Sequence, residues 1–258
     1  MKIGVFVKQV PDTETKIRTK ADGSGIEIDG VKFIVNPYDE FAIEEALKTK
    51  EKAGAAEVVI LSLGPTRVVE ALRSGLAMGA DRAIHIDDSG IVLDSFVTAK
   101  ILAKTAETEK FDLIFCGKQA IDDDAAQVPQ MVAELLNIPH VMVIEKFEMN
   151  AEKNGVVVHR RIGGGAKEVY DVKLPAIFGC EKGLNTPRYA SLPGIMKARS
   201  KPVTTLKALE LMGDSKPRTG NRNYRLPPER PAGKMLQGTP EEVAKELVRL
   251  LREEAKVI

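Results

Sequence analysis

The stretch that decides the fold is FDLIFCG (residues 111–117), followed by KQAIDDDAAQ (118–127) and VPQMVAELL (128–136). The first part is a short apolar run typical of a buried strand, and the last places apolar residues at helical spacing. A strand that leads through a glycine-containing loop into a helix is the repeating unit of an open parallel sheet. The stretch therefore predicts an α/β fold with a ligand-binding turn at Gly117.

The same alternation of short apolar runs and amphipathic stretches recurs along the first 145 residues. Strands that alternate with helices imply a largely parallel sheet with right-handed crossovers. The predicted strands are Lys2–Lys8, Glu57–Leu63, Arg82–Ile86, Phe111–Cys116 and Val141–Glu145, and helical patterns lie at 36–54, 66–79, about 94–107 and 128–136.

The first helix has the clearest start. Asn36 is a good N-cap, Pro37 fits the first helical position, and Asp39 stands where a capping box requires an acid. Gly54 is typical of the residue that ends a helix. We expect these side chains to cap the helix, while backbone groups beside them contact a ligand.

The pattern changes after residue 146. Gly155–Arg161 and Glu168–Leu174 flank three glycines and predict a β-hairpin, and Ala176–Cys180 predicts one more buried strand. The segment from Glu181 to about Gly238 is rich in Pro, Lys and Arg and lacks periodicity, but it carries apolar residues. An irregular stretch of this length suggests docking onto another chain. A last helix begins at the capping box Thr239–Glu242.

These elements predict a Rossmann-like α/β fold, with an open, mostly parallel sheet, helices on both faces, a β-hairpin and a C-terminal docking arm. Residues 1–182 form the predicted nucleotide-binding domain. Residues 183–258 form the predicted recognition loop and arm with its terminal helix.

Composition narrows the function. With 38 Lys+Arg against 37 Asp+Glu, the chain lacks the basic excess of a general nucleic-acid binder. The cysteines Cys116 and Cys180 each end an apolar run, and the three histidines are scattered, so we expect neither a disulfide nor a metal site. We see no signal peptide or membrane span, which makes the cytoplasm the expected compartment. No nucleophile and base stand at a catalytic spacing, so we expect no enzyme chemistry in this chain.

The loop after Gly117 is the strongest local signal. A glycine lets a ligand approach the backbone, and the following helix start offers free N–H groups suited to phosphate. The acids Asp122, Asp123 and Asp124 allow two interpretations, a metal site or helix caps, and capping is favoured because consecutive side chains point in different directions. If the first strand lies at the centre of the sheet, Asn36–Asp39, Leu63 and Gly117 face one crevice.

Five motifs resemble the β subunits of electron transfer flavoproteins, in the right order along essentially the whole chain. They are Val7–Asp12 (VKQVPD), Asn36–Glu40 (NPYDE), Ala77–Arg82 (AMGADR), Gly117–Gln130 and Arg188–Ala198 (RYASLPGIMKA). The resemblance implies a heterodimer in which an α subunit holds the redox FAD and the β subunit binds AMP. It also implies that electrons pass from flavin-dependent dehydrogenases, such as acyl-CoA dehydrogenases, to a quinone oxidoreductase, the only link to a membrane.

The resemblance carries over two sets of residues. AMP contacts are expected from Phe6, Asn36, Pro37, Tyr38, Asp39, Leu63, Gly117, Lys118, Gln119, Ala120, Ile121, Asp122, Asp123, Asp124, Ala125, Ala126, Gln127 and Val128, with Tyr38 near the flavin of the α subunit. Partner contacts are expected from Tyr189, Leu192, Pro193, Ile195, Met196 and Lys197, with Leu192 at the tip of the loop that enters the dehydrogenase.

Two alternatives stay open. One branch of the family binds a second FAD in place of AMP and bifurcates electrons from NADH. Asp123 stands where that branch has glycine, and its charge and size disfavour a second flavin, so the sequence favours AMP. The other alternative is a stand-alone nucleotide-binding module of the universal-stress type, which the long C-terminal segment disfavours.

Overall fold

The computed structural model describes residues 1–230 and 232–258, so residue 231 of the predicted arm lies outside the described residues. The chain divides into two compact units. Unit 1 comprises Met1–Ile17 and Glu27–Arg222, and unit 2 comprises Arg18–Ile26 and Asn223–Ile258.

Unit 1 is built on a twisted sheet which, among the described residues, has nine strands in the order β11-β5-β4-β1-β6-β10-β7-β8-β9. All neighbours from β11 to β7 are parallel, and β7, β8 and β9 are antiparallel. The bounds are β1 Lys2–Phe6, β4 Glu57–Gly64, β5 Arg82–Asp87, β6 Leu113–Gly117, β7 His140–Met149, β8 Gly155–Arg161, β9 Lys167–Lys173, β10 Ala176–Cys180 and β11 Val203–Lys207. A short antiparallel pair, β2 Gln9–Pro11 and β3 Phe33–Val35, stands apart from this sheet.

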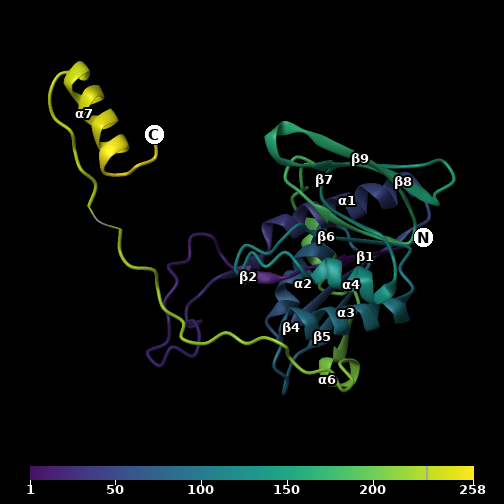
Figure 1. Ribbon diagram of the computed structural model, residues 1–258. Helices are drawn as coiled ribbons and strands as arrows, with labels where there is room; N and C mark the ends of the chain where they lie inside the picture. Colours follow the sequence, from purple (N-terminus) through teal and green to yellow (C-terminus); the bar gives the residue numbers. More distant parts are fainter. Residues whose placement is uncertain (231) are drawn as a thin grey trace. The chain divides into compact units, whose positions relative to one another are not determined.

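Helices cover both faces of the sheet (Figure 1), which confirms the predicted Rossmann-like fold class. Buried side chains of α1 Pro37–Ala53, α2 Val68–Met78 and α5 Leu192–Ala198 belong to one core cluster. Those of α3 Ser95–Glu109, α4 Val128–Leu136 and α6 Ala208–Leu211 belong to the other. Because successive side chains of a strand point to opposite faces, β1 sends Ile3 and Val5 into the first cluster and Phe6 into the second.

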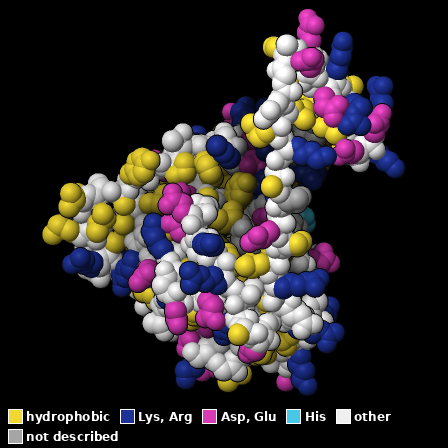
Figure 2. All heavy atoms as spheres, turned by 90° about the vertical axis from the view of Figure 1, so that its left-hand side faces the viewer, with side chains coloured by type: hydrophobic (Ala, Val, Ile, Leu, Met, Phe, Trp, Pro, Cys, Tyr) yellow, Lys and Arg dark blue, Asp and Glu magenta, His cyan; other side chains and the backbone are white. Residues whose placement is uncertain are grey.

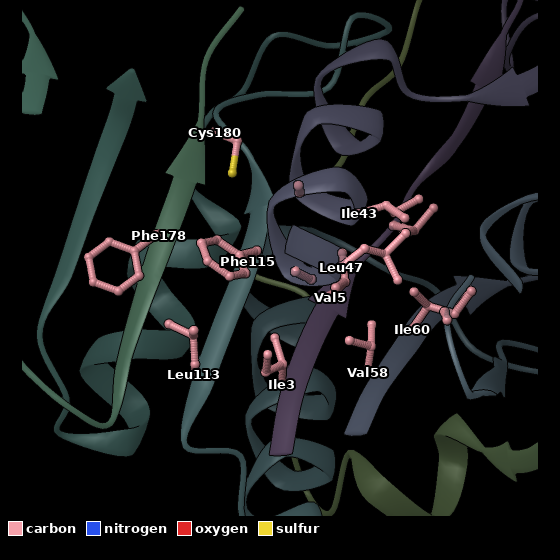
Figure 3. Close-up of a cluster of buried hydrophobic side chains, with 14 of the residues drawn as sticks. Ile3, Val5, Ile43, Leu47, Val58, Ile60, Leu113, Phe115, Phe178 and Cys180 are labelled. Carbon is pink, nitrogen blue, oxygen red and sulfur yellow. The ribbon is translucent and has the colours of Figure 1, made fainter. Parts of the chain in front are cut away.

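The first core cluster is the larger and fixes the sheet to α1 and α2. Figure 3 shows Ile43 and Leu47 of α1 above Val5 and Ile60, with Phe115 and Phe178 on the neighbouring strands. Phe115 also contacts Phe147 edge to face, with ring centroids 5.0 Å apart. This packing holds the carboxyl ends of β1 and β6 in a rigid frame.

The prediction of an irregular stretch from Glu181 to about Gly238 was wrong in part. This stretch contains α5, β11 and α6, and β11 extends the sheet beside β5. The compact unit therefore continues to Arg222, beyond the predicted domain end at residue 182. β11 was hard to find because Val203–Lys207 is an edge strand with no fully buried residue, so its apolar pattern is weak.

Unit 2 contains the last helix, α7 Pro240–Glu253. Its predicted capping box is confirmed, since Thr239 N donates to Glu242 Oε2 at 2.8 Å and Glu242 N donates to Thr239 Oγ1 at 3.4 Å. No residue of α7 is buried, and Leu247 is 46% exposed. Within unit 2, Tyr224 N also bonds to Gly23 O at 2.9 Å. No helix of the described residues is long and apolar enough to span a membrane.

Candidate functional site

The carboxyl ends of the parallel strands β1 and β6 lie beside each other at the centre of the sheet. This is the switch point, on either side of which the chain adds strands in opposite directions from β1. β1 pairs with β4 on one side and with β6 on the other. The connection after β1 leads to α1 on one face, and the connection after β6 leads to α4 on the other. A cavity of about 580 Å³ opens here and is called the switch-point cavity below. Such a point is where open α/β sheets bind ligands.

The predicted crevice is present in the structure, although it leaves out five of the eighteen predicted cofactor residues. Pro37, Tyr38, Ile121, Asp122 and Asp124 do not line the cavity. The residues that do line it are Phe6, Asn36, Asp39, Leu63, Gly117, Lys118, Gln119, Ala120, Asp123, Ala125, Ala126, Gln127 and Val128.

Asp39 holds the two strand ends together. Its carboxylate accepts hydrogen bonds from Lys8 N at 2.7 Å, from Gly117 N at 2.9 Å and from Asn36 Nδ2 at 2.9 Å. Burial raises the pKa of Asp39 to about 7, although these three donors favour the charged carboxylate. Asp39 is thus a buried acid that ties β1 to β6 under the cavity.

Asn36 stands at the N-cap position of α1 with Pro37 after it, as predicted, but the predicted capping bonds of the Asn36 and Asp39 side chains were wrong. Asn36 makes no side-chain cap hydrogen bond to α1. Its Nδ2 instead donates to Gln119 O at 2.9 Å, and its Oδ1 accepts from Ile121 N at 3.2 Å. The Asn36 side chain is therefore committed to the loop Lys118–Gln127, called the switch loop below, whereas Asp39 bonds to the strand ends at Lys8 and Gly117.

Gly117 is required by this close approach. A Cβ atom on Gly117 would lie 2.4 Å from Asp39 Oδ1 and 2.7 Å from the Cβ of Tyr38. Real Cβ atoms do not approach so closely, and the third neighbour, the backbone carbonyl carbon of Tyr38 at 2.9 Å, cannot move aside as a flexible side-chain tip can. The glycine is needed for contact with α1, and it also lines the switch-point cavity, where the predicted ligand contact stays a prediction.

The three acids of the switch loop do not cap a helix, although capping was the favoured interpretation of the sequence. Helix α4 begins at Val128 with Gln127 before it, so the acids do not cap it. Lys8 Nζ bonds to Asp122 at 2.8 Å and to Asp123 at 3.2 Å, and Gln119 Nε2 bonds to Asp124 at 2.7 Å. Burial alone would lower the pKa of Lys8, but these carboxylates raise it above its usual value. Among the described residues, no cluster of His, Cys, Asp and Glu could hold a metal ion.

Lys118 fixes the first residues of the loop to the neighbouring strand. Its Nζ lies 2.7 Å from Glu181 Oε2, and Glu181 is 2% exposed. The same ammonium group lies 4.8 Å from the centroid of the Tyr38 ring. Burial would raise the pKa of Glu181, but Lys118 and the Lys182 N–H lower it below its usual value. Lys118 therefore holds Tyr38 next to the loop but outside the cavity lining.

The backbone at the end of the switch loop is arranged for an anion. Asp124 and Ala126 both have φ of 49°, a left-handed conformation that non-glycine residues rarely adopt. Among the hydrogen bonds of the described residues, none uses the N–H groups of Ala126, Gln127 or Val128. These donors lie at the start of α4, where the helix dipole also favours negative charge.

Sequence reasoning missed the wall that α3 contributes. Leu93, Asp94, Ser95, Thr98 and Leu102 line the switch-point cavity. Two of them bring hydroxyl groups. The expected helix start at Asp94 could have indicated this wall. Helix α3 follows β5, the strand next to β4, and it packs on the same face of the sheet as α4, which bounds the cavity.

Sequence reasoning also missed the segment Thr219–Asn221, which lines the same cavity although Thr219 lies 125 residues after Asp94. Asp94 Oδ2 accepts hydrogen bonds from Arg218 N at 2.6 Å and Thr219 N at 3.0 Å, while its Oδ1 caps α3 through Val97 N at 2.8 Å. No sequence motif marks this pairing, because it joins two segments that meet only in the folded chain.

A second region exposes apolar side chains. In Tyr189–Met196, called the apolar loop below, the exposed fractions are 99% for Tyr189, 77% for Leu192, 46% for Ile195 and 70% for Met196. Figure 2 shows hydrophobic side chains gathered in surface patches with lysine and arginine beside them. Pro193 and Lys197 lie on the same short helix, α5, which Ser191 caps through Gly194 N at 3.1 Å.

Charged side chains anchor the apolar loop at both ends. Arg188 bonds to Glu44 through Nε at 2.8 Å and Nη2 at 2.9 Å, and to Glu51 through Nη1 at 2.6 Å. Arg73 Nη1 donates to Lys201 O at 2.8 Å and also to Ala198 O. These contacts fix the loop on α1 and α2 and leave its apolar side chains outside.

Comparisons with known proteins agree with this arrangement. Residues 25–211 match the family model described as "Electron transfer flavoprotein domain". The chain is 45% identical over 258 residues to the mitochondrial electron transfer flavoprotein subunit beta of Arabidopsis thaliana, with 100% of both chains covered. It is 41% identical over 263 residues to the Bacillus subtilis subunit, again with 100% of both covered, and 41% identical over 248 residues to the Homo sapiens subunit, with 95% of this chain and 96% of the other covered.

Proposed function

The chain belongs to the family of electron transfer flavoprotein β subunits, and from this premise we propose its cofactors, partners and place in electron transfer. It is an electron transfer subunit by family. In the proposal it forms a heterodimer with an α subunit, binds AMP in the switch-point cavity and contacts a FAD that the α subunit mainly holds. The heterodimer accepts electrons from flavin-dependent dehydrogenases, such as acyl-CoA dehydrogenases of fatty acid oxidation, and passes them to a quinone reductase.

The free backbone donors carry the assignment of AMP. A nucleoside monophosphate has one phosphate, and the N–H groups of Ala126, Gln127 and Val128 offer one compact anion site at the start of α4. Phe6 and Leu63 supply apolar surface suited to a base, and Ser95 and Thr98 supply hydroxyls suited to a ribose. The cavity volume of about 580 Å³ lies within the usual range for small-ligand sites.

Asp123 supports AMP over a second FAD. Asp123 lines the cavity, and Lys8 Nζ pairs with its carboxylate at 3.2 Å. A dinucleotide would bring a second phosphate and a ring system past this carboxylate, which is unfavourable through both charge repulsion and lack of room. Lys8, already shared with Asp122, has little positive charge left to offset a second phosphate.

The flavin contact and the dehydrogenase contact use other residues. When bound, FAD supplies the redox chemistry, and this chain's own residues position the partners. Tyr38, outside the AMP cavity and held beside Lys118, is the proposed aromatic neighbour of the flavin. Leu192 is the proposed anchor of the dehydrogenase, because it exposes 77% of an apolar side chain on a loop whose ends are fixed to α1 and α2. Lys197 steers an acidic partner.

The proposal also places the heterodimer in the cytoplasm, with its electron acceptor as the only link to a membrane. Isolation of the chain with its α subunit, followed by denaturation and counting of the released ligands, tests the assignment. One FAD and one AMP per heterodimer is the expected result. Two FAD and no AMP would instead identify an NADH-oxidising bifurcating subunit and reject the AMP proposal.

A further inference from the structure

The segment Arg218–Asn221, called the strap below, closes one side of the switch-point cavity without belonging to any helix or strand. Most of the other lining residues lie in or next to the strand ends, in or next to α3 and α4, or in the switch loop. The described strap residues are all solvent-exposed. A wall with so little buried surface opens locally at a small free-energy cost, unlike the walls built on the sheet.

One side chain provides the polar tether of the strap. Asp94 Oδ2 accepts from the N–H groups of Arg218 at 2.6 Å and Thr219 at 3.0 Å, and from Thr219 Oγ1 at 3.3 Å. The Arg218 guanidinium also lies 3.6 Å from the centroid of the Phe96 ring. Both Asp94 and Phe96 belong to the start of α3, so the strap is fixed to the same helical turn that presents Ser95 to the cavity.

We propose that the strap is the movable wall of the switch-point cavity, and that Asp94 is the positioning residue that keeps the strap closed and slows ligand release. The inference rests on the proposed function, since the ligand is taken to be AMP. In the closed form, Thr219, Gly220 and Asn221 cover the ligand. Release requires the strap to leave Asp94, while α3 keeps its cap through Oδ1.

The two carboxylate oxygens of Asp94 have separate roles, because Oδ1 caps α3 and Oδ2 holds the strap, and one substitution can remove the second role alone. In Asp94→Asn, the amide oxygen still caps α3 through Val97 N, because asparagine is as good an N-cap as aspartate. The amide nitrogen replaces Oδ2 and cannot accept from Arg218 or Thr219. The variant therefore releases the strap with α3 intact. Arg218→Ala removes only the stacking on Phe96 and leaves Asp94 unchanged.

The experiment uses the complete heterodimer loaded with labelled AMP and chased with excess unlabelled AMP. We expect Asp94→Asn to release the label at least tenfold faster than the natural protein, and Arg218→Ala to release it about threefold faster. Asp87→Asn is the matched control, because Asp87 bonds to Ser89 N at 3.2 Å in a similar turn but lies outside the cavity. Equal release rates for Asp94→Asn and the natural protein would overturn the proposal.

Deuterium uptake gives a second, ligand-independent result. Opening of the strap exposes the cavity wall, so Asp94→Asn should raise exchange in 216–222 and around Phe6–Lys8 without changing exchange in the middle of α3. Uptake equal to that of Asp87→Asn rejects the movable wall. Absence of AMP from the purified natural heterodimer rejects the proposed nucleotide, and the uptake comparison then still decides whether Asp94 holds the strap.

Discussion

The switch loop and the apolar loop are held to the same sheet framework in opposite ways. In the switch loop, the side chains of Asp122, Asp123 and Asp124 bond to Lys8 or Gln119, and backbone N–H groups at the loop's end stay free. In the apolar loop, the flanking main chain is bound, by Glu44 at Arg188 N and by Arg73 at Lys201 O, and the side chains stay free.

The difference matches two kinds of ligand. A phosphate is recognised by directed N–H donors, so the loop that binds it must leave its backbone free. A protein surface is recognised by apolar side chains in a preorganised geometry, so the loop that binds it must fix its backbone. Each of the following substitutions alters either the switch loop with its supports or the apolar loop with its supports, beginning with the largest expected effect.

Gly117→Ala should break the switch loop. The added methyl group would collide with Asp39 and Tyr38, and we expect the free energy of unfolding of the heterodimer to fall by about 3 kcal/mol, with loss of bound ligand. Guanidinium unfolding measures the first effect. Gly163→Ala is the control, since a Cβ atom there meets nothing within 4 Å and the residue lies outside the cavity lining. A stable Gly117→Ala variant with its ligand retained would contradict the role given to this contact.

Asp39 should make stability depend on pH. Its pKa is about 7 in the folded chain and lies near 3.8 when unfolded, so the folded state holds the proton more tightly. Stability is then fully present below the unfolded pKa and is lost as pH rises toward 7. Between pH 5 and 7, the natural protein should lose about 2 kcal/mol relative to Asp39→Asn, which cannot titrate.

The measurement is the free energy of unfolding at several pH values. Asp87→Asn serves as control, because bonds from Ser89 hold the pKa of Asp87 below its usual value and its titration ends below this window. Parallel pH curves for the natural protein and Asp39→Asn would show that Asp39 is already charged at pH 5.

Leu192→Ala should weaken the apolar loop as a docking site. Truncation of a hot-spot side chain typically costs more than about 1 kcal/mol of binding free energy. Electron acceptance from the dehydrogenase should therefore slow by roughly tenfold. AMP content should not change. Stopped-flow reduction of the heterodimer measures the rate. Leu209→Ala is the control, as Leu209 is 61% exposed on α6, outside the loop. Equal rates for the two variants would reject the docking assignment.

Arg188→Lys should have the smallest effect. A lysine keeps the charge but cannot bridge Glu44 and Glu51 with a planar fork, so the loop becomes less ordered. We expect about a threefold rise in KM for the dehydrogenase with kcat unchanged, as roughly 0.7 kcal/mol of preorganisation is lost. Arg160→Lys, at the surface pair with Glu168, is the control. A change in kcat without KM would show that Arg188 acts on electron transfer instead of on docking.

Local patterns were enough for most of the framework. The periodicity of Phe111–Leu136 predicted a strand, a turn and a helix, and the structure has β6, the switch loop and α4 there. The same reasoning failed where a side chain has two available partners. Asn36 and Asp39 fit an N-cap and a capping box, but their side chains bond instead to the backbone of Gln119 and Gly117, 83 and 78 residues away.

By itself, the sequence determined the α/β alternation, the parallel sheet, the position of Gly117 after a central strand and the family of the chain. These follow from short-range periodicity, helix signals and motifs, which are readable along the chain. The tertiary structure alone decided that Gly117 is packed against α1, that Asp122 and Asp123 pair with Lys8, and that Asp94 bonds to the strap beside the cavity. Each of these depends on which distant groups burial brings within hydrogen-bond distance, and no local pattern encodes that choice.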